Sequence, residues 1–363
     1  MTLKKTPLNR SHQRLKARLV DFAGWEMPIQ YSGTLPEHLA VRKNAGLFDI
    51  SHMGEIEIKG SNATTVAQHV TCNDITALTE GQAQYSALLN HQGTFVDDVI
   101  VYKFSDFNYL LCVNASNSDK AFDWIRVNAP KKAEIINRSK DFVQLAVQGP
   151  SSQEILQQLT SINLEDLSPY HFCLGEIAGH QAVISRTGYT GENGYELYIS
   201  PGDGTPIWES ILKIGSEYGL QPIGLAARNT LRLEMKYPLY GNDIDDTTTP
   251  LEAGLDWIAK LDQEEFIGRD ALLQQKSAGI KRKLVGFELL ERGIPRDGYL
   301  VYLGDMEISK VTSGSYSPSL GKGIGLTYLP NEHTEIGTEI QIMIRGVAKA
   351  AKIVATPFYK GLI

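Results

Sequence analysis

The sequence predicts an α+β protein whose sheets are mainly antiparallel, and three observations support this prediction. Short runs rich in β-branched and aromatic residues recur through the first two thirds of the chain, with helical patterns between them. These strands and helices do not alternate strictly, which disfavours a doubly wound parallel sheet. From about Lys281 the helical periodicity stops, and short strands are separated by Gly or Asp turns, as in a small β-barrel or sandwich.

The expected elements follow from these patterns in chain order. Alternation or β-branched and aromatic composition predicts strands over 54–59, 98–104, 108–113, 142–148, 181–186 and 195–199. Helical spacing of apolar residues predicts helices over 63–69, 118–127, 151–159, 206–218 and 225–235. The helix at 151 begins with two serines, which are good N-caps. A linker to the β-rich last domain is expected near 274–283.

Length and composition narrow the class of protein. With 363 residues the chain is long enough for two or three domains. Its 35 Lys and Arg against 42 Asp and Glu give a net charge of −7, which disfavours nucleic acid as the main partner. Three widely spaced cysteines indicate neither a disulfide framework nor a structural zinc site. The N-terminus lacks a secretory h-region, and no run approaches the roughly 18 apolar residues of a membrane span. We therefore expect a cytoplasmic protein without a membrane partner.

Several familiar binding motifs are absent or do not fit. The glycine-rich stretch 321–325 indicates a turn rather than a dinucleotide site, because it lies in the β-rich region and no helix follows it. No HExxH or paired histidine spacing suggests a catalytic zinc, so no metal is expected. The acidic stretch 243–246 is interpreted as a solvated loop in preference to a cation site.

A pair of aspartates begins one predicted strand. In an extended chain Asp98 shares a face with Ile100, Tyr102 and Phe104, whereas Asp97 lies on the other face. Apolar surroundings would raise the pKa of a carboxylate on that face and suit proton handling. The residues alone also allow a second interpretation, a pair of turn aspartates before a strand.

The segment 185–196 predicts a glycine-rich hairpin between two strands. Tyr189 and Tyr195 could present ring faces, and the two oxygens of Glu196 would match a planar heterocycle with adjacent N–H donors. Ordinary aromatic packing in a hairpin is the alternative interpretation.

Two arginines lie four residues apart in the helix predicted over 225–235. Arg228 and Arg232 repel each other unless an acid or an anionic ligand compensates them. Glu234 is the local acid. A salt-bridged helix face and an anion-binding face therefore both stay open.

Segments spread over nearly the whole chain form a more specific pattern than any one of them. They are 6–8, 20–28, 48–55, 85–86, 97–98, 147–150, 185–196, 227–228, 231–234, 239–241, 312–314, 317–321 and 357–359. With them the sequence resembles the T-protein, or aminomethyltransferase, family of the glycine cleavage system.

This resemblance implies three domains in a ring around a central cavity. The first domain would be discontinuous, with residues 1–51 and 138–275, and the second would be an insertion over 52–137. The last would be a C-terminal β-barrel over 279–363. Tetrahydrofolate would bind in the cavity as co-substrate.

The resemblance also implies the reaction and the partners. An aminomethyl group, carried as a thioether on the dihydrolipoyl arm of H protein, would pass its carbon to tetrahydrofolate. The products would be 5,10-methylenetetrahydrofolate, ammonia and reduced lipoyl H protein. The enzyme would work functionally with the P and L proteins.

Residue by residue, the resemblance places the catalytic aspartate at Asp98. It places the pterin-binding glutamate at Glu196 and a folate-contacting arginine at Arg228. A fixed carboxylate near folate N5 would orient the amine, assist proton transfer and stabilise developing positive charge. It also matches Tyr359 to a folate-contacting tyrosine near the C-terminus. Five further positions match residues that line the family's folate cavity: Met53, Tyr85, Asn114, Tyr189 and Tyr237.

The sequence departs from the family pattern at two places. Asn229 replaces the usual aspartate after Arg228, and Cys72 interrupts a Thr-Asn-Asp segment. A related folate-binding protein of iron–sulfur assembly carries a cysteine in the equivalent hairpin, and this hairpin has none. A folate-dependent demethylase that acts on a small methyl donor stays an alternative, as does a folate-binding module without turnover.

Overall fold

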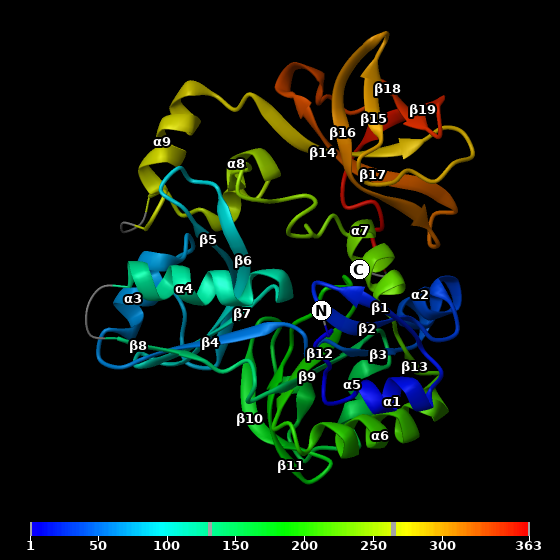
Figure 1. The fold of residues 1–363 in the computed structure, drawn as a ribbon. Helices are drawn as coiled ribbons and strands as arrows, with labels where there is room; N and C mark the ends of the chain where they lie inside the picture. Colours follow the sequence, from blue (N-terminus) through cyan, green and yellow to red (C-terminus); the bar gives the residue numbers. More distant parts are fainter. Residues whose placement is uncertain (1, 130–132, 263–265, 362–363) are drawn as a thin grey trace. The chain divides into compact units, whose positions relative to one another are not determined.

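The computed structural model describes residues 2–129, 133–262 and 266–361. Its packing divides these residues into two compact units, which we describe separately (Figure 1). The first unit comprises residues up to Val70, Asp74–Ser86 and Asp98–Arg228, and the second comprises Thr71–Asn73, Ala87–Asp97 and the residues from Asn229 onward. The mainly antiparallel α+β class predicted from the sequence is confirmed by the sheets of both units.

A six-stranded sheet forms one half of the first unit. Its strand order is β10-β11-β12-β9-β3-β13, and all neighbours are antiparallel except β3 and β13. The helices α5 (Ser152–Gln157) and α6 (Gly204–Gly215) contribute Ile155, Trp208 and Ile211 to the apolar core on one face (Figure 1). The strands are β3 (Gly46–Asp49), β9 (Val143–Gln148), β10 (Phe172–Ile177), β11 (His180–Ser185), β12 (Gly194–Ile199) and β13 (Gln221–Pro222).

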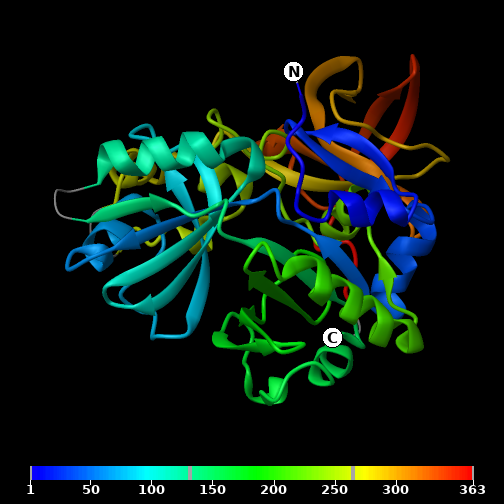
Figure 2. The same cartoon turned by 60° about the horizontal axis from the view of Figure 1, so that its bottom comes forward.

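A five-stranded sheet has the order β5-β6-β7-β4-β8. Two helices, α3 (Ala63–Val70) and α4 (Ser118–Asn128), accompany it (Figure 2). The last residues of β5 and the first of β6 belong to the second unit. The strands are β4 (Gly54–Lys59), β5 (Gln82–Leu89), β6 (Phe95–Ser105), β7 (Asn108–Val113) and β8 (Glu134–Asn137).

An apolar layer joins the two sheets inside the first unit. Tyr102 of β6 packs there with Phe172 of β10 and Tyr198 of β12, and Ile100 and Phe104 pack against the same cluster. The face of β6 that was predicted from the alternation is therefore the face that meets the other sheet. Asp98 lies on this face, two residues before Ile100.

The second unit contains the C-terminal barrel that the sequence predicts. Its strands close in the order β14-β17-β16-β15-β18-β19. Phe287, Val301, Leu329, Ile342 and Ile353 are buried in its core. The strands are β14 (Arg282–Leu289), β15 (Leu300–Leu303), β16 (Met306–Ser317), β17 (Lys322–Pro330), β18 (Glu339–Ile344) and β19 (Val347–Val354).

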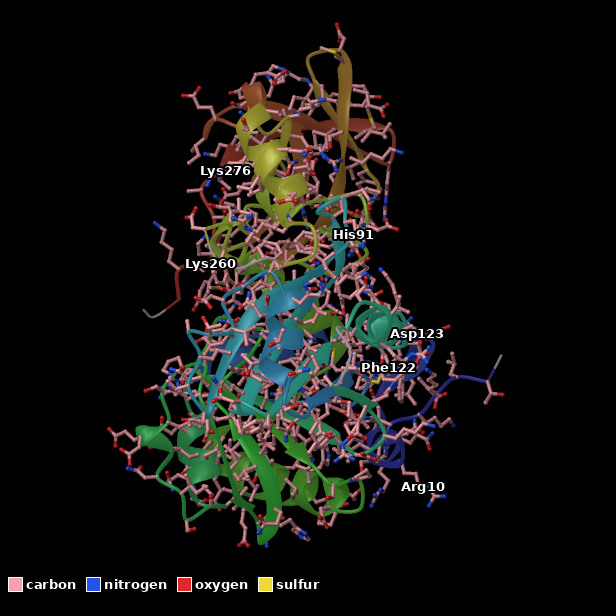
Figure 3. All side chains as sticks on the ribbon, turned by 90° about the vertical axis from the view of Figure 1, so that its left-hand side faces the viewer. Arg10, His91, Phe122, Asp123, Lys260 and Lys276 are labelled. Carbon is pink, nitrogen blue, oxygen red and sulfur yellow. The ribbon has the colours of Figure 1, made fainter. Side chains whose placement is uncertain are left out.

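The linker before the barrel lies within the expected range 274–283 but is shorter. Helix α9 (Arg269–Ala278) occupies the first half of that segment, so only 279–281 separate it from β14. Its sequence is rich in helix-forming Ala, Leu, Gln and Lys, with Leu272 buried and Lys276 exposed (Figure 3). Gly279 ends it with a φ of +88°. The helix expected over 151–159 is shorter in the structure, and the helix expected over 206–218 begins and ends earlier as α6.

In the described part of the chain no helix is long and apolar enough to cross a lipid bilayer.

The glycine-rich stretch and the remaining short elements complete the description of the two units. The turn expected in the glycine-rich stretch is at Gly321, and Gly323 and Gly325 lie in β17. The other elements are α1 (Asn9–Arg14), β1 (Arg18–Phe22), β2 (Trp25–Gln30), α2 (Thr34–Lys43), α7 (Leu225–Glu234), α8 (Pro250–Ala253) and the short 3-10 turns η1 (Ala115–Asn117), η2 (Leu164–Asp166), η3 (Ser216–Tyr218), η4 (Asp256–Ile258) and η5 (Asn331–His333).

Candidate active site

The Asp98 carboxylate is held by two side chains of the first unit. Tyr85 on β5 donates from Oη to Asp98 Oδ2 at 2.9 Å. Asn114, which follows β7, donates from Nδ2 to Asp98 Oδ1 at 2.7 Å. Because β5 and β7 are the neighbours of β6, the sheet brings both donors to the aspartate. The two hydrogen bonds fix the plane of the carboxylate.

Tyr85 is a permanent donor in this arrangement. Burial raises the pKa of its phenol well above the ordinary value, and the negative charge of Asp98 raises it further. Tyr189 and Tyr170 lie close enough to raise the same pKa. Tyr85 therefore stays protonated at neutral pH and keeps its hydrogen bond to Asp98.

Glu196 lies on β12 and accepts a short hydrogen bond. Thr187 donates from Oγ1 to Glu196 Oε2 at 2.6 Å. Burial raises the pKa of Glu196, while the Thr187 hydrogen bond and the charge of Arg228 oppose that shift. The structure thus brings the predicted Glu196 and Arg228 into one electrostatic environment.

Arg228 lies in the first turn of α7 and stacks on the hairpin. Its guanidinium carbon is 4.5 Å from the centre of the Tyr189 ring. The start of α7 is fixed by Glu37, which accepts hydrogen bonds from the backbone N–H groups of Gly224, Tyr31 and Gly33. This carboxylate therefore sets the position from which Arg228 extends.

Gln148 of β9 supports the hairpin through two hydrogen bonds. Gln148 donates from Nε2 to the Thr187 carbonyl at 3.1 Å and accepts from Thr190 Oγ1 at 2.9 Å. A Cβ at Gly188 or at Gly194 would collide with the Gln148 side chain. The close approach expected from the glycines therefore occurs, and it serves to support the hairpin.

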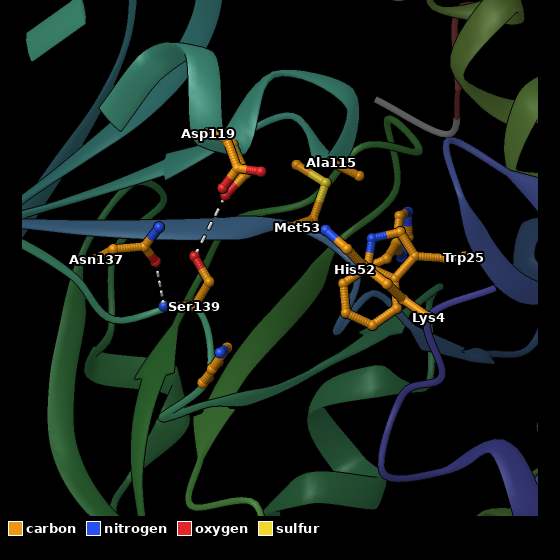
Figure 4. A pocket seen from close by; sticks show the side chains of 10 residues that line it. Lys4, Trp25, His52, Met53, Ala115, Asp119, Asn137 and Ser139 are labelled. Atoms are coloured by element: carbon orange, nitrogen blue, oxygen red, sulfur yellow. Dashed lines mark hydrogen bonds between the residues drawn. The ribbon is translucent and has the colours of Figure 1, made fainter. Parts of the chain in front are cut away.

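A pocket of about 390 Å³ lies beside this site (Figure 4). Met53 and Ala115 lie between a side formed by Trp25 and His52 and a side formed by Asn137 and Ser139. Ala115 directly follows Asn114, so the pocket wall adjoins the Asp98 donor in the chain. The remaining lining residues, Lys4, Lys140, Asp119 and Ser118, include two cations and one anion, so the pocket does not select a ligand charge by itself.

His52 is a neutral member of this wall. Burial, together with the positive charge of Arg228, lowers the pKa of its imidazole to about 4. Its Nδ1 is buried without a hydrogen-bond partner among the described residues. His52 therefore adds no positive charge to the pocket at neutral pH.

Two of the predicted site residues lie in the second unit. Tyr359 donates its backbone N–H to the Glu234 carbonyl at the end of α7. Tyr237 follows the same helix, and its N–H donates to the Arg232 carbonyl. The backbones of both tyrosines are thus hydrogen-bonded to the last turn of α7. Their place at a folate site with Asp98 stays a prediction.

The second arginine of α7 has a structural partner. Arg232 is buried and pairs with Asp243, whose oxygens also accept from Thr312 and Ser313. The interpretation of 243–246 as a solvated loop is therefore wrong for Asp243, which is fully buried. The substituted Asn229 accepts from Arg232 at 2.9 and 2.8 Å. Glu234, the acid that was considered as a partner of the two arginines, accepts hydrogen bonds from Ser317 and Ser319.

Sequence reasoning missed three hydroxyl residues of this region. Thr187, Tyr102 and Tyr198 are linked to Glu196 through hydrogen bonds that cross between the two sheets. No local pattern marks them, although the alternation of β6 places Tyr102 on the Asp98 face. Among the described residues, no group of three or more His, Cys, Asp or Glu side chains could hold a metal ion.

Comparison with known proteins covers nearly the whole chain. The family described as "GCVT N-terminal domain" matches residues 8–263, and the "Glycine cleavage T-protein C-terminal barrel domain" matches residues 282–360. An aminomethyltransferase of Desulfitobacterium hafniense is 49% identical over 359 residues, which are 99% of this chain and 98% of the relative. An aminomethyltransferase of Halothermothrix orenii is 47% identical over 98% of this chain and 100% of the relative.

A solved structure supports the same assignment. The crystal structure of glycine cleavage system aminomethyltransferase T from Bartonella henselae superposes with a TM-score of 0.93. It is 32% identical and covers 99% of both chains.

Proposed function

This chain belongs to the glycine cleavage T-protein family and is an aminomethyltransferase, and we propose that its acceptor is tetrahydrofolate and its donor a lipoylated H protein. The carbon–sulfur bond of the S-aminomethyl-dihydrolipoyl arm breaks, and the sulfur leaves as a thiolate. Folate N5 attacks the resulting iminium carbon. Ammonia then leaves and N10 closes the ring, which gives 5,10-methylenetetrahydrofolate.

The observation that carries this proposal is the doubly hydrogen-bonded Asp98 carboxylate in the same unit as Glu196 and Arg228. A transfer through an iminium carbon develops positive charge, and a fixed carboxylate stabilises that charge without reorganising. In the proposed reaction the same oriented carboxylate would also take a proton from the attacking amine.

Glu196 and its neighbours suit the pterin end of the acceptor. A pterin presents a ring N–H beside an amino group, and a carboxylate can accept from both at once. The charge of Arg228 favours the ionised form of Glu196. Arg228 is itself held over the Tyr189 ring, so it is oriented before any ligand binds.

The catalytic role of Asp98 is tested by Asp98→Asn. This variant should bind tetrahydrofolate with nearly unchanged affinity and form methylenetetrahydrofolate at least about a hundredfold more slowly, because general acid–base groups typically contribute that much. The assay uses purified lipoylated H protein as donor. Unchanged turnover would contradict the assignment.

The donor distinguishes the two candidate reactions. Product formation from aminomethylated H protein, but not from small methyl donors, is the expected result. Turnover with a small methyl donor alone would favour a folate-dependent demethylase, the alternative that the hairpin and Asp98 also allow.

The domain boundaries 1–51 with 138–275, 52–137 and 279–363 stay a prediction, as do the ring arrangement and the cytoplasmic location. The five-stranded sheet runs between Gly54 and Asn137, and the barrel strands run between Arg282 and Val354. These ranges support the inserted and C-terminal boundaries. Cooperation with P and L proteins is part of the same proposal.

A further inference from the structure

A chain of three hydroxyl groups leads through the core of the first unit to Glu196. Tyr198 Oη donates to Tyr102 Oη at 3.0 Å. Tyr102 Oη is 3.4 Å from Thr187 Oγ1, and Thr187 Oγ1 is the 2.6 Å donor to the carboxylate. All three side chains are buried, with exposed fractions of 1%, 1% and 6%. We call Tyr198, Tyr102 and Thr187 the hydroxyl chain.

The carboxylate of Glu196, at the end of the hydroxyl chain, determines the direction in which its hydrogen bonds are donated. A carboxylate accepts only, so the single proton of Thr187 points to Glu196. Thr187 must then accept from Tyr102 and from Ser185, whose Oγ is 3.0 Å away. The oxygen of Tyr102 is left to accept from Tyr198. Each hydroxyl can therefore donate toward Glu196 while the carboxylate stays ionised.

The tyrosines of the hydroxyl chain are held in place by ring contacts. The Tyr102 and Tyr198 rings meet edge to face with centroids 5.4 Å apart. Phe172 packs on Tyr102 at 5.4 Å, and Phe142 packs on Tyr198 at 5.9 Å. Burial also raises the pKa of both phenols well above the ordinary value, so they stay donors. The chain is therefore rigid and keeps its protons.

The hydroxyl chain spans the two sheets at the candidate site. Tyr198 lies two residues after Glu196 on β12, so both project from one face. Tyr102 comes from β6, on the face that also carries Asp98. The chain thus ties the strand of Glu196 to the strand of the proposed catalytic carboxylate.

We propose that the hydroxyl chain positions Glu196 for recognition of the pterin. The hydroxyl chain ends in the hydrogen bond to Oε2 of Glu196, which fixes the plane of this carboxylate. The other acceptor positions of Glu196 are left for the N–H groups of the bicyclic heterocycle. Its members are positioning residues, since they act through Glu196. This inference rests on the proposed function, which supplies the folate acceptor.

The expected effects grow toward Glu196. Thr187→Val should raise the Kd for tetrahydrofolate about tenfold, the value of one hydrogen bond to a charged group. Tyr198→Phe removes a hydroxyl that is three hydrogen bonds from Glu196, and it should raise the Kd about two- to threefold. In both variants kcat at saturating folate should change less than KM. Thr187→Ser keeps the hydroxyl and should restore binding to within about twofold of the parent.

A matched control separates positioning from general loss of packing. Tyr109 is equally buried, and its hydroxyl is 2.9 Å from Thr64 Oγ1, away from Glu196. Tyr109→Phe removes a buried hydroxyl of the same kind and should leave the folate Kd unchanged. Thermal unfolding of every variant reports whether the fold is retained.

The decisive measurement is a double-mutant cycle of Tyr198→Phe with Glu196→Ala, with Kd measured by titration of tetrahydrofolate under anaerobic conditions. The inference requires the Tyr198→Phe effect to disappear once Glu196 is truncated. If the effect persists in the Glu196→Ala protein, or if Thr187→Val and Tyr198→Phe bind like the parent, the inference is overturned. Failure of the parent protein to bind tetrahydrofolate would instead overturn the proposed function.

Discussion

At the scale of single residues, the site is organised by donors behind its carboxylates. Tyr85 and Asn114 orient Asp98, and Thr187 orients Glu196. Tyr85 and Asn114 were expected to line the folate cavity. Their hydrogen bonds to Asp98 indicate a second role, the orientation of this carboxylate. A substitution at Tyr85 can distinguish this role from direct contact with folate.

Tyr85→Phe should lower kcat about tenfold while the KM for tetrahydrofolate changes less than about twofold, because one charge-assisted hydrogen bond to Asp98 is lost. Steady-state kinetics with aminomethylated H protein measure both constants, and Tyr109→Phe is again the control. A raised KM with an unchanged kcat would mean that Tyr85 acts through the ligand alone.

The pH dependence of folate binding should report Glu196. Its pKa is raised above the ordinary 4.5 by burial, and the groups around it are Arg228 on α7, Tyr102 on β6, Cys112 on β7 and Tyr198 on β12. Only Arg228 is charged at neutral pH among these neighbours, since burial raises the pKa of each of the other three.

In the proposed pterin contact only the carboxylate form of Glu196 accepts both N–H groups, so binding should be full at neutral pH and weaken as the pH falls through the raised pKa of Glu196. The weakening should begin above pH 4.5. Glu196→Gln should bind more weakly at neutral pH and lose this part of the pH dependence. Titrations between pH 7 and 5 measure the effect, and equal slopes for both proteins would contradict it.

At the scale of elements, α7 and the hairpin are held by residues that are not among the predicted site residues. Glu37 on α2 holds the backbone ahead of α7, and Gln148 on β9 supports the hairpin. Arg42, also on α2, donates to the Thr190 carbonyl and pairs with Glu192 at 2.9 Å. Helix α2 therefore fixes both elements that carry Arg228 and Tyr189.

Glu37→Ala should lower the free energy of unfolding by about 2–3 kcal/mol, because one buried and two part-buried N–H groups lose their acceptor. Folate binding should weaken as well, since Gly224 no longer anchors the start of the helix of Arg228. Urea unfolding and folate titration measure the two effects. Lys43→Ala, an exposed position on the same helix, should change neither, and a Glu37→Ala protein as stable as the parent would refute the role.

How far the sequence predicts this site depends on distance along the chain. The face of Asp98 on β6 could be predicted, because a period of two is a local property of a strand. The contacts of Tyr102 with Thr187 and Tyr198 join residues 85 and 96 positions apart, and no local pattern encodes such pairs. The predicted linker was too long because it included residues 274–278, which are the helix-forming last residues of α9.

At the scale of the whole molecule, none of the three cysteines is among the proposed catalytic or folate-contacting residues. Cys72, Cys112 and Cys173 form no disulfide, and the first two are buried. Burial raises the pKa of the Cys112 and Cys173 thiols, which lowers their reactivity. The thiol chemistry of the proposed reaction is therefore left to the lipoyl arm.

Thiol labelling of the native protein should show one accessible cysteine. At pH 8 a disulfide reagent should react first with the half-buried Cys173, and with the other two only after unfolding in urea. Cys173→Ser should remove the early phase and leave turnover unchanged. Rapid modification of two or three native thiols would contradict the burial described for Cys72 and Cys112.

The support of the hairpin by Gln148 has a consequence for how the sequence of this protein can change over evolutionary time. A side chain at Gly188 or Gly194 would meet the amide end of Gln148, which would have to move away from Thr187 and Thr190. Substitution of either glycine is therefore disfavoured as long as Gln148 keeps these hydrogen bonds. A segment that resembles a surface loop is in this way tied to the sheet beside it, and its two glycines are expected to change together with Gln148.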